Sequence, residues 1–555
     1  MFSYSYDNLK RILQTDRGKA FIAAAKKKYK EDYEGKPILA LEYSQFKRFY
    51  IDGDRSGFQS QYFDRRRRLM LLQVLALSDD KYLVDLENIL SAICEEFIWV
   101  LPAHAFEDDV VAKYEQIDLF SAETAMYLSE TVYVYGDKLS KDIRNRIQVS
   151  IQQKIVDIFE NGHFNFEDTH SNWAAVCGCG VGLAYLYLFP EKFPAVKERI
   201  FTCMEHYLLG ISEDGYCEEG MNYWQYGFGF FAIFFDVYTQ LTGERPEILS
   251  RQKVLNLLRY PTNANMARGV YLPFADGGSS NFTPFPEMVY AFKNLFGDDF
   301  HLISMKLDWN HMRALMFRAI NGIDKFGDYQ EKQDTQGTVY YQERQVFIRK
   351  EKEYSFTAKC GTNYEMHNHN DIGSFQIVRN GKRLIADLGA GEYTKEYFRV
   401  PEVRFGEKVF VCGSMSHSVP ILDGKYQKHW KPYRGEVLSQ SEREITMDIA
   451  GAYEENSQGM LVKYVTEVDK ISVQYCNLTG RPVRYRFVSE YMPKITDAGV
   501  LIEDMKLHSK NGLTATISEK EYVNAKRMIM KAYLIDFDVD TTEAEIEFFF
   551  SFKNN

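Results

Sequence analysis

The sequence predicts an α+β protein of several domains, in which a helical domain precedes a β domain. Up to about residue 330, apolar residues recur every three or four positions, as in 149–158, which is the period of an amphipathic helix. After about residue 335 the period changes to two, as in 471–475, which is the period of a half-buried strand. We therefore expect two domains, at 1–330 and 331–555, and a length of 555 residues is sufficient for both.

The order of the expected elements narrows the architecture of each half. Proline punctuates the first half at helix-sized intervals, which is typical of a helical bundle or an α/α toroid. In the second half, Asn380-Gly381 separates two short apolar runs and is a strong signal of a two-residue hairpin. Many such strands joined by polar turns indicate an antiparallel β-sandwich.

The overall charge and the N-terminus limit the classes of partner. A net charge of −11 argues against a nucleic-acid partner, because phosphate binding normally requires a basic patch or domain. No apolar run reaches the roughly 18 residues that span a bilayer, so we expect no membrane segment. The N-terminal residues mix charges and lack the apolar stretch of a signal peptide, so we expect a cytoplasmic protein. The scattered cysteines are expected to be reduced and mostly buried.

A histidine-rich segment in the second half carries the densest group of chemically active side chains. In a strand, His367, His369 and Asp371 would point to one face. Asp387 ends an apolar strand, where an acid requires a cation or a metal as its partner. His417 follows in a serine-rich loop. Two imidazoles and a carboxylate form a plausible zinc set, although spacing alone does not say which histidine binds metal and which acts in catalysis.

Two segments of the helical half combine amide or phenol side chains with expected turns and helix starts. Tyr223 and Tyr226 follow a glycine-containing bend and are three residues apart, so on a helix they share a face. Buried packing and a functional hydroxyl explain these tyrosines equally well, whereas Trp224 is typical of core packing. Asn172 lies at an expected helix start, where N-capping is as good an explanation as function.

Taken together, these segments resemble the heparinase II/III-like polysaccharide lyases. The matching features are an Asn-Trp segment, the pattern DG…EG..YW.YG, a stretch of the form HxHxD..SF followed by D.G, and a Ser-x-x-His loop, over most of residues 60–430. The resemblance implies an N-terminal α/α toroid, an incomplete helical barrel, packed on a C-terminal antiparallel β-sandwich with a cleft between them. It also implies β-elimination on a uronic-acid-containing glycan, of the glycosaminoglycan or alginate type, to give a 4,5-unsaturated uronate end.

The same resemblance implies roles for particular residues. Asn172 corresponds to the amide that neutralises the substrate carboxylate, and His367 corresponds to the catalytic histidine. The catalytic tyrosine corresponds to Tyr226 or Tyr223, and we prefer Tyr226 because its separation of 54 residues from Asn172 suits the family pattern better. This chain has Ser171 at the position where some members carry a second histidine.

The resemblance further implies that His369, Asp387 and His417 bind a zinc ion, usually a structural one, and that no organic cofactor is needed. An anionic uronate-containing oligosaccharide or polysaccharide is the expected partner, and a homodimer is left open. The residues expected to bind this glycan are Arg67, Arg68, Trp173, Trp224, Glu219 and Arg404. The arginine run that contains the first two fits a solvated helix face equally well.

Two alternatives use the same residues differently. The HxHxD of 367–371 is similar to the HxHxDH motif of metallo-β-lactamase-like, metal-dependent hydrolases, but Ile372 replaces the final histidine, and that fold is an α/β sandwich without a long helical half. The other alternative is a non-catalytic glycan-binding protein. It would keep the aromatic residues and arginines but would need neither Tyr226 nor His367.

Overall fold

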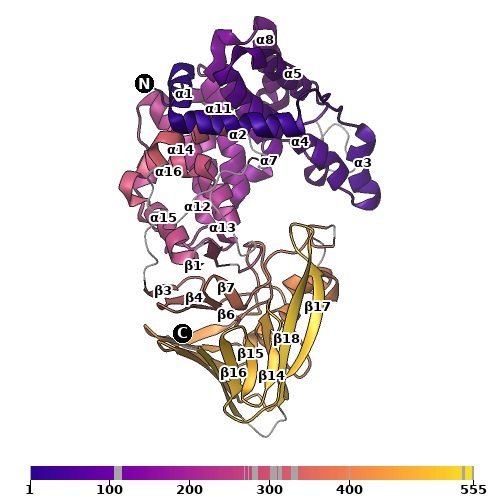
Figure 1. Ribbon diagram of the computed structural model, residues 1–555, viewed down its shortest axis with the longest axis vertical. Coiled ribbons are helices and arrows are strands. Elements are labelled where there is room, and N and C mark those ends of the chain that lie inside the picture. Colours follow the sequence, from indigo (N-terminus) through magenta and orange to yellow (C-terminus); the bar gives the residue numbers. More distant parts are fainter. Residues whose placement is uncertain are drawn as a thin grey trace.

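The chain forms a helical region followed by a region of antiparallel sheets (Figure 1). The structure, a computed structural model, describes residues 2–105, 115–267, 269–272, 274–277, 285–300, 309, 315–326, 336–394, 396–398, 401–539 and 544–552. Within this part of the chain, the helices of eight or more residues are α1 (Tyr6–Leu13), α2 (Asp16–Asp32), α3 (Tyr43–Asp52), α4 (Ser56–Ser78), α5 (Leu83–Cys94), α7 (Leu119–Tyr135), α8 (Lys141–Ile151), α11 (Asn172–Leu188), α12 (Phe193–Leu209), α14 (Gly229–Thr242), α15 (Gln252–Ala264), α16 (Pro286–Phe296) and α17 (Met316–Phe326). The predicted order of helices and strands is confirmed, while the boundary predicted between residues 330 and 331 lies outside the described residues.

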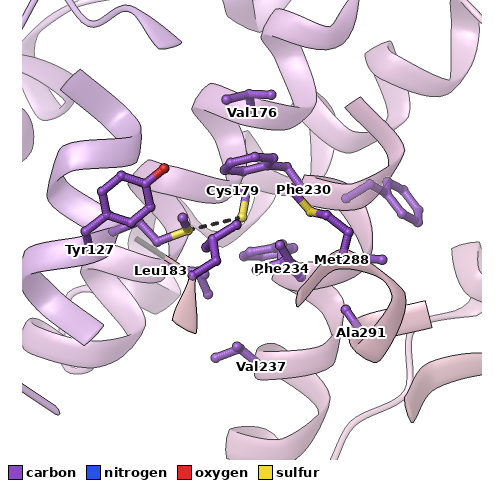
Figure 2. Close-up of a cluster of buried hydrophobic side chains, with 14 of the residues drawn as sticks. Tyr127, Val176, Cys179, Leu183, Phe230, Phe234, Val237, Met288 and Ala291 are labelled. Atoms are coloured by element: carbon purple, nitrogen blue, oxygen red, sulfur yellow. Dashed lines mark hydrogen bonds between the residues drawn. The ribbon is translucent and has the colours of Figure 1, made fainter. Parts of the chain in front are cut away.

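Helix α11 lies at the centre of the helical region, where α7, α12 and α14 pack against it. Its small residues allow this close packing: a Cβ on Gly180 would lie 2.5 Å from the backbone of Ala122 in α7. Cys179, on the same helix, is buried among Phe230, Phe234 and Met288 (Figure 2). This thiol therefore serves the apolar core, and burial raises its pKa.

Three antiparallel sheets follow the helical region. The five-stranded sheet has the order β3 (Gly337–Tyr341), β4 (Val346–Lys350), β5 (Ser355–Lys359), β6 (Phe375–Arg379) and β7 (Lys382–Ile385). The eight-stranded sheet has the order β14 (Lys494–Thr496), β15 (Gly499–Ile502), β16 (Met505–Ser509), β19 (Glu545–Phe552), β12 (Lys470–Asn477), β11 (Met460–Thr466), β10 (Glu444–Asp448) and β9 (Glu436–Gln440). The four-stranded sheet has the order β17 (Thr516–Val523), β18 (Ile529–Val539), β13 (Val483–Ser489) and β8 (Pro420–Leu422).

One apolar core joins the three sheets. Phe375 of β6 has its ring centroid 5.2 Å from that of Tyr464 in β11, 5.8 Å from that of Phe487 in β13 and 5.6 Å from that of Phe550 in β19. The predicted hairpin is confirmed at Asn380 and Gly381, which join β6 to β7 with φ of 51° and 73°. Both values lie in the left-handed region that a tight hairpin turn requires.

A short strand pair inside the helical region makes the contact with the sheets. β1 (Asn265–Ala267) and β2 (Val270–Tyr271) follow α15, and β1 packs against β5 and β6. The periodicity of the first half did not predict these strands, because they are too short for a period of two to be recognised. No helix in the described part of the chain is long and apolar enough to cross a membrane.

Candidate active site

A tyrosine from the helical region and a histidine from the sheet region meet face to face. Tyr223 is the last residue of the short helix α13 (Gly220–Tyr223), and His367 lies in the loop that precedes β6. Their ring centroids are 4.3 Å apart at an interplanar angle of 30°, and the Tyr223 hydroxyl lies 3.5 Å from Nδ1 of His367. A phenol and an imidazole this close can act on one bound molecule as acid and base.

Gly220 allows a third element to reach this pair. Its φ is +78°, and a Cβ added there would lie 2.5 Å from the Cα of Gly277. The loop 274–277 can therefore lie directly against the start of α13, and the backbone N–H of Asp276 donates to the carbonyl of His367 at 3.2 Å. A π-helix, η5 (Trp224–Phe228), follows α13, and such π-helical turns occur often at functional sites.

The histidine-rich segment is a loop, so the predicted strand with three ligands on one face is wrong. Residues 366–374 contain no strand, and His367 has a φ of +53°. Asp371 does not accompany the histidines, because its Oδ1 accepts a hydrogen bond from the buried Lys359 at 2.9 Å. The alternation of His and Asp along the sequence reproduced the period of a strand without forming one.

Asp276 is the acid that organises the site, and sequence analysis missed it. Its Oδ2 lies 2.7 Å from Nδ1 of His367, and its Oδ1 lies 3.0 Å from Nε2 of His369. It also accepts hydrogen bonds from the hydroxyls of Tyr393, at 3.0 Å, and Tyr397. Burial alone would raise the pKa of Asp276, but the hydrogen bonds and charges of the two histidines hold it well below its usual value. Only an Asp-Gly turn marks this residue in the sequence.

Tyr393 joins the phenol of the helical region to this acid. Its hydroxyl lies 3.0 Å from that of Tyr223 and 3.5 Å from Nδ1 of His367. Arg404 approaches from a neighbouring loop, with a guanidinium nitrogen 3.6 Å from Oδ2 of Asp276. The structure therefore places Arg404, which the sequence predicted as a glycan-binding residue, beside the Tyr223–His367 pair.

Charges around Tyr223 set its protonation. Burial raises the pKa of Tyr223 well above its usual value, and the charges of Asp276 and Glu219 raise it further, whereas Arg404 lowers it. Glu219 has a carboxylate oxygen 3.7 Å from Nε2 of His367, and burial raises the pKa of this carboxyl as well. Without a bound molecule, Tyr223 is therefore a neutral phenol.

A second arginine faces the tyrosines from the helical region. Arg55 occupies the N-cap position of α4. Burial and the neighbouring Arg527 lower its pKa, while the adjacent Tyr393 and Tyr223 raise it. Arg55 thus lies within electrostatic range of both phenols. No motif in the sequence distinguishes it from the other arginines of the first half.

A group of possible metal ligands lies directly behind the histidine loop. His369, Asp387 and His417 are buried, and each offers a ligand atom within 4.8 Å of the others. Among the described residues, Nδ1 of His369, Nδ1 of His417 and Oδ2 of Asp387 have no hydrogen-bond partner. The last two atoms are 3.3 Å apart but lack the geometry of a hydrogen bond. Buried polar atoms without partners are costly, so three of them facing one point fit a bound cation.

The partners of the other ring nitrogens complete this metal-binding arrangement. Nε2 of His369 faces Asp276 at 3.0 Å, and Nε2 of His417 lies 3.1 Å from the carbonyl oxygen of Val411. Both contacts place the proton on Nε2 and leave the Nδ1 lone pair free to bind metal. Oδ1 of Asp387 accepts from the backbone N–H of Gly389 at 2.8 Å, which leaves Oδ2 for the same purpose. A second possible group, Asp276, His369 and Cys412, shares one histidine with the first.

Tyr226 and Asn172 are not joined to the Tyr223–His367 pair. The Tyr226 hydroxyl donates to Glu123 of α7, within the helical region. Asn172 is the first residue of α11 and is 3% exposed, while Ser171 is the N-cap. Within the described part of the chain, no hydrogen bond links Asn172 to either member of the pair. Helix α11 does pack against η5, so the two segments are neighbours.

The remaining residues predicted to bind glycan have other surroundings. Trp224 cannot contact a substrate in this structure, because it is 1% exposed and its indole N–H donates to the carbonyl of Leu257. Arg67 pairs with Asp64 at 3.1 Å, and Arg68 donates to the carbonyl of Lys36 at 3.0 Å. Both arginines thus bind neighbours among the early helices. Trp173 is half-buried, with its ring centroid 4.9 Å from that of His104.

Comparison with known proteins identifies the fold. No family model matches the chain, and no curated protein matches it. Among solved structures, the chain is similar to heparinase III, with a TM-score of 0.61 and 12% identity over 91% of this chain and 80% of that one. It is also similar to a mutant of the heparan sulfate lyase from Pedobacter heparinus, with a TM-score of 0.59 and 12% identity over 89% of this chain and 77% of that one.

A third structure extends the similarity to another kind of lyase. The chondroitin AC lyase of Streptomyces coelicolor A3, solved with chondroitin sulphate, has a TM-score of 0.57 and 11% identity over 99% of this chain and 83% of that one. Identities this low show the fold alone. The protein has the fold of these polysaccharide lyases, which confirms at the level of fold the resemblance predicted from its sequence.

Proposed function

We propose that the protein is a polysaccharide lyase that cleaves a uronate-containing glycan by β-elimination. The observation that carries this proposal is the meeting of Tyr223, His367 and Asp276, contributed by both regions of a fold shared with glycosaminoglycan lyases. We infer further that the helices form an α/α toroid and the sheets an antiparallel sandwich, with the glycan lying between them.

The reaction requires a base for the proton on C5 and an acid for the oxygen on C4. We assign the base to His367, whose Nδ1 is held by Asp276 at 2.7 Å so that Nε2 can accept a proton. As the C5–H bond breaks, its electron pair forms the C4–C5 double bond and the C4–O bond breaks. Tyr223, kept neutral by burial, donates its proton to the leaving oxygen. Transfer of one proton from imidazolium to phenolate then restores the pair.

Positive charge beside this pair makes the C5 proton acidic. A uronate C–H becomes removable only when the developing charge on its carboxylate is stabilised by preorganised donors. Arg404 and Arg55 both lie beside Tyr223, and we assign the carboxylate to them. Glu219, 3.7 Å from Nε2 of His367, would stabilise the imidazolium that forms there. We keep Asn172 as a further carboxylate-binding candidate, contributed by α11.

We propose that His369, Asp387 and His417 bind a zinc ion in a structural role. The three buried atoms without partners support this assignment, since two imidazoles and a carboxylate are a common zinc set. When bound, the ion would join the histidine loop to the segment after β7 and to the loop before β8. This connection would fix the position of His367, two residues from a ligand.

The hydrolase alternative fits the structure less well. Asp371 is held by Lys359 instead of facing the histidines, and the helical and antiparallel regions differ from the α/β sandwich that the HxHxDH motif requires. An assay on alginate, heparan sulfate, chondroitin and hyaluronan, with mass analysis of the products, tests the proposal. Products lighter by one water than the hydrolysis products, with ultraviolet absorbance, are expected; hydrolysed ends, or no product from any of them, contradict it.

A further inference from the structure

Four aromatic side chains form a continuous strip on the sheet region. The strip consists of Phe405, His429, Trp430 and Tyr364. Tyr364 stacks on Trp430 with ring centroids 5.5 Å apart, and His429 stacks on Phe405 at 4.3 Å. His429 also lies 5.2 Å from Trp430, which joins the two pairs. Tyr364 is 40% exposed and Trp430 is 49% exposed, so the far half of the strip faces solvent.

One end of the strip lies beside the candidate active site. Phe405 follows Arg404, whose guanidinium lies 3.6 Å from Asp276. Tyr364 lies three residues before His367 in the same loop, and Met366 between them is 46% exposed. The strip therefore leads away from the residues that we assign to catalysis, along a surface that a long substrate would cross.

The exposed tryptophan is held in an unusual backbone conformation. Trp430 has a φ of +103°, which a residue with a side chain rarely adopts. The loop around it is anchored by the buried Asn363, whose amide donates to the carbonyl of Lys428 at 2.9 Å and to Gln427 at 3.2 Å. Strain that persists because its surroundings enforce it is typical of ligand-binding positions. Core packing does not require it, since the indole is half exposed.

The same loop is strongly basic in an acidic protein. Residues 425–434 contain three lysines and one arginine, all exposed, and no acidic residue, although the net charge of the chain is −11. Lys431 lies 5.4 Å from the ring centroid of Tyr364. The acidic groups nearest the loop include Asp423, which pairs with Lys425 at 3.0 Å, and Glu454, which pairs with Arg481. Lys431 therefore places its positive charge over the exposed end of the strip.

We propose that the aromatic strip is a binding subsite for anionic sugar residues beyond the bond that is cleaved. Exposed aromatic faces can pack against the C–H faces of sugar rings, and the lysines can pair with carboxylate or sulfate groups of the same chain. The inference rests on the proposed function for its choice of glycan. It adds a second contact region that positions long substrates and takes no part in proton transfer.

Affinity and turnover measured separately test the subsite. Trp430→Ala, Tyr364→Ala and Lys431→Gln are compared with wild type for binding to heparan sulfate, chondroitin sulfate and alginate by calorimetry, with dextran as the neutral polymer. We expect binding to at least one anionic glycan, no binding to dextran, and a loss of about tenfold in affinity for each variant. Tyr133→Ala is the matched control, because Tyr133 is also 40% exposed but packs against Phe2 near the N-terminus.

The outcomes separate the subsite from the proposed function. For active protein, the variants should raise KM for polymer about tenfold while kcat on the shortest cleaved oligosaccharide stays unchanged. Binding lost through the strip in a protein that cleaves no glycan supports the subsite and contradicts the lyase. Variants that bind every glycan as wild type does overturn the subsite even if the enzyme is active. Equal binding to dextran, or no binding by wild type, also overturns it.

Discussion

Replacing Asp276 with asparagine perturbs the group on which the candidate site depends. Its carboxylate lies 2.7 Å from His367, 3.0 Å from His369 and 3.0 Å from the Tyr393 hydroxyl, and it also accepts from Tyr397. Hydrogen bonds to a charged group contribute about 1.5–3 kcal/mol each. An amide would present its NH₂ to one of the donors, so that donor loses its partner or an imidazole changes tautomer. The same change in a Ser-His-Asp triad lowers kcat about 10⁴-fold, and we expect kcat/KM to fall by about 10³–10⁴.

The assay must separate this effect from lost stability. The rate of unsaturated-product formation by Asp276→Asn is measured below its unfolding temperature, with circular dichroism confirming that it is folded. Asp236→Asn is the matched control, because Asp236 is also buried and accepts hydrogen bonds from Tyr4 and Gln240 in the helical core. The control should lower the unfolding temperature and leave kcat/KM unchanged. A kcat/KM for Asp276→Asn within about threefold of wild type refutes the reasoning.

Three further predictions concern the metal, a buried acid and a glycine. A chelator should lower the unfolding temperature, because ligand binding at a thousandfold excess over Kd stabilises by about 4 kcal/mol; a reversible loss of turnover at unchanged unfolding temperature would indicate a catalytic metal instead. Burial and the charge of Glu365 raise the pKa of Glu218 to about 7, so the stability that this group contributes below its unfolded pKa of about 4.3 is lost as the pH rises through about 7. Urea unfolding of Glu218→Gln should therefore show a smaller fall in unfolding free energy between about pH 5 and pH 8 than wild type, on the order of 1–3 kcal/mol, and an equal fall contradicts the assignment. Gly220→Ala and Gly243→Ala both place a side chain at a φ near +77°, but only the former also meets Gly277 at 2.5 Å; each should be destabilised by about 1–2 kcal/mol, and kcat/KM should fall in Gly220→Ala alone.

The fold and the metal group were predictable because they follow from local chemistry. The change of period near residue 335 reports which face of each element is buried, and Asn380-Gly381 can occupy the left-handed region that the hairpin needs. His369, Asp387 and His417 are residue types whose burial requires a partner, so their presence in apolar surroundings indicated a cation.

The organisation of the catalytic pair was less predictable, because it depends on packing between distant segments. Tyr223 and Tyr226 would share a face on a regular α-helix, but a π-helix begins at Trp224 and changes the angle between them. Tyr226 then faces Glu123, and Tyr223 faces the sheet region. Asp276 comes from a loop with no motif, and only the close approach allowed by Gly220 brings it to the histidines.

Parallel kinetics of Tyr223→Phe and Tyr226→Phe test the central claim most directly. Each substitution removes one hydroxyl and keeps the ring, and turnover is followed by the ultraviolet absorbance of the unsaturated uronate. The contacts of Tyr223 with His367 and Tyr393 predict a fall in kcat of about 10²–10⁴ for Tyr223→Phe and a change of less than about tenfold for Tyr226→Phe. Full activity in Tyr223→Phe, with or without a loss in Tyr226→Phe, contradicts the proposed acid–base pair.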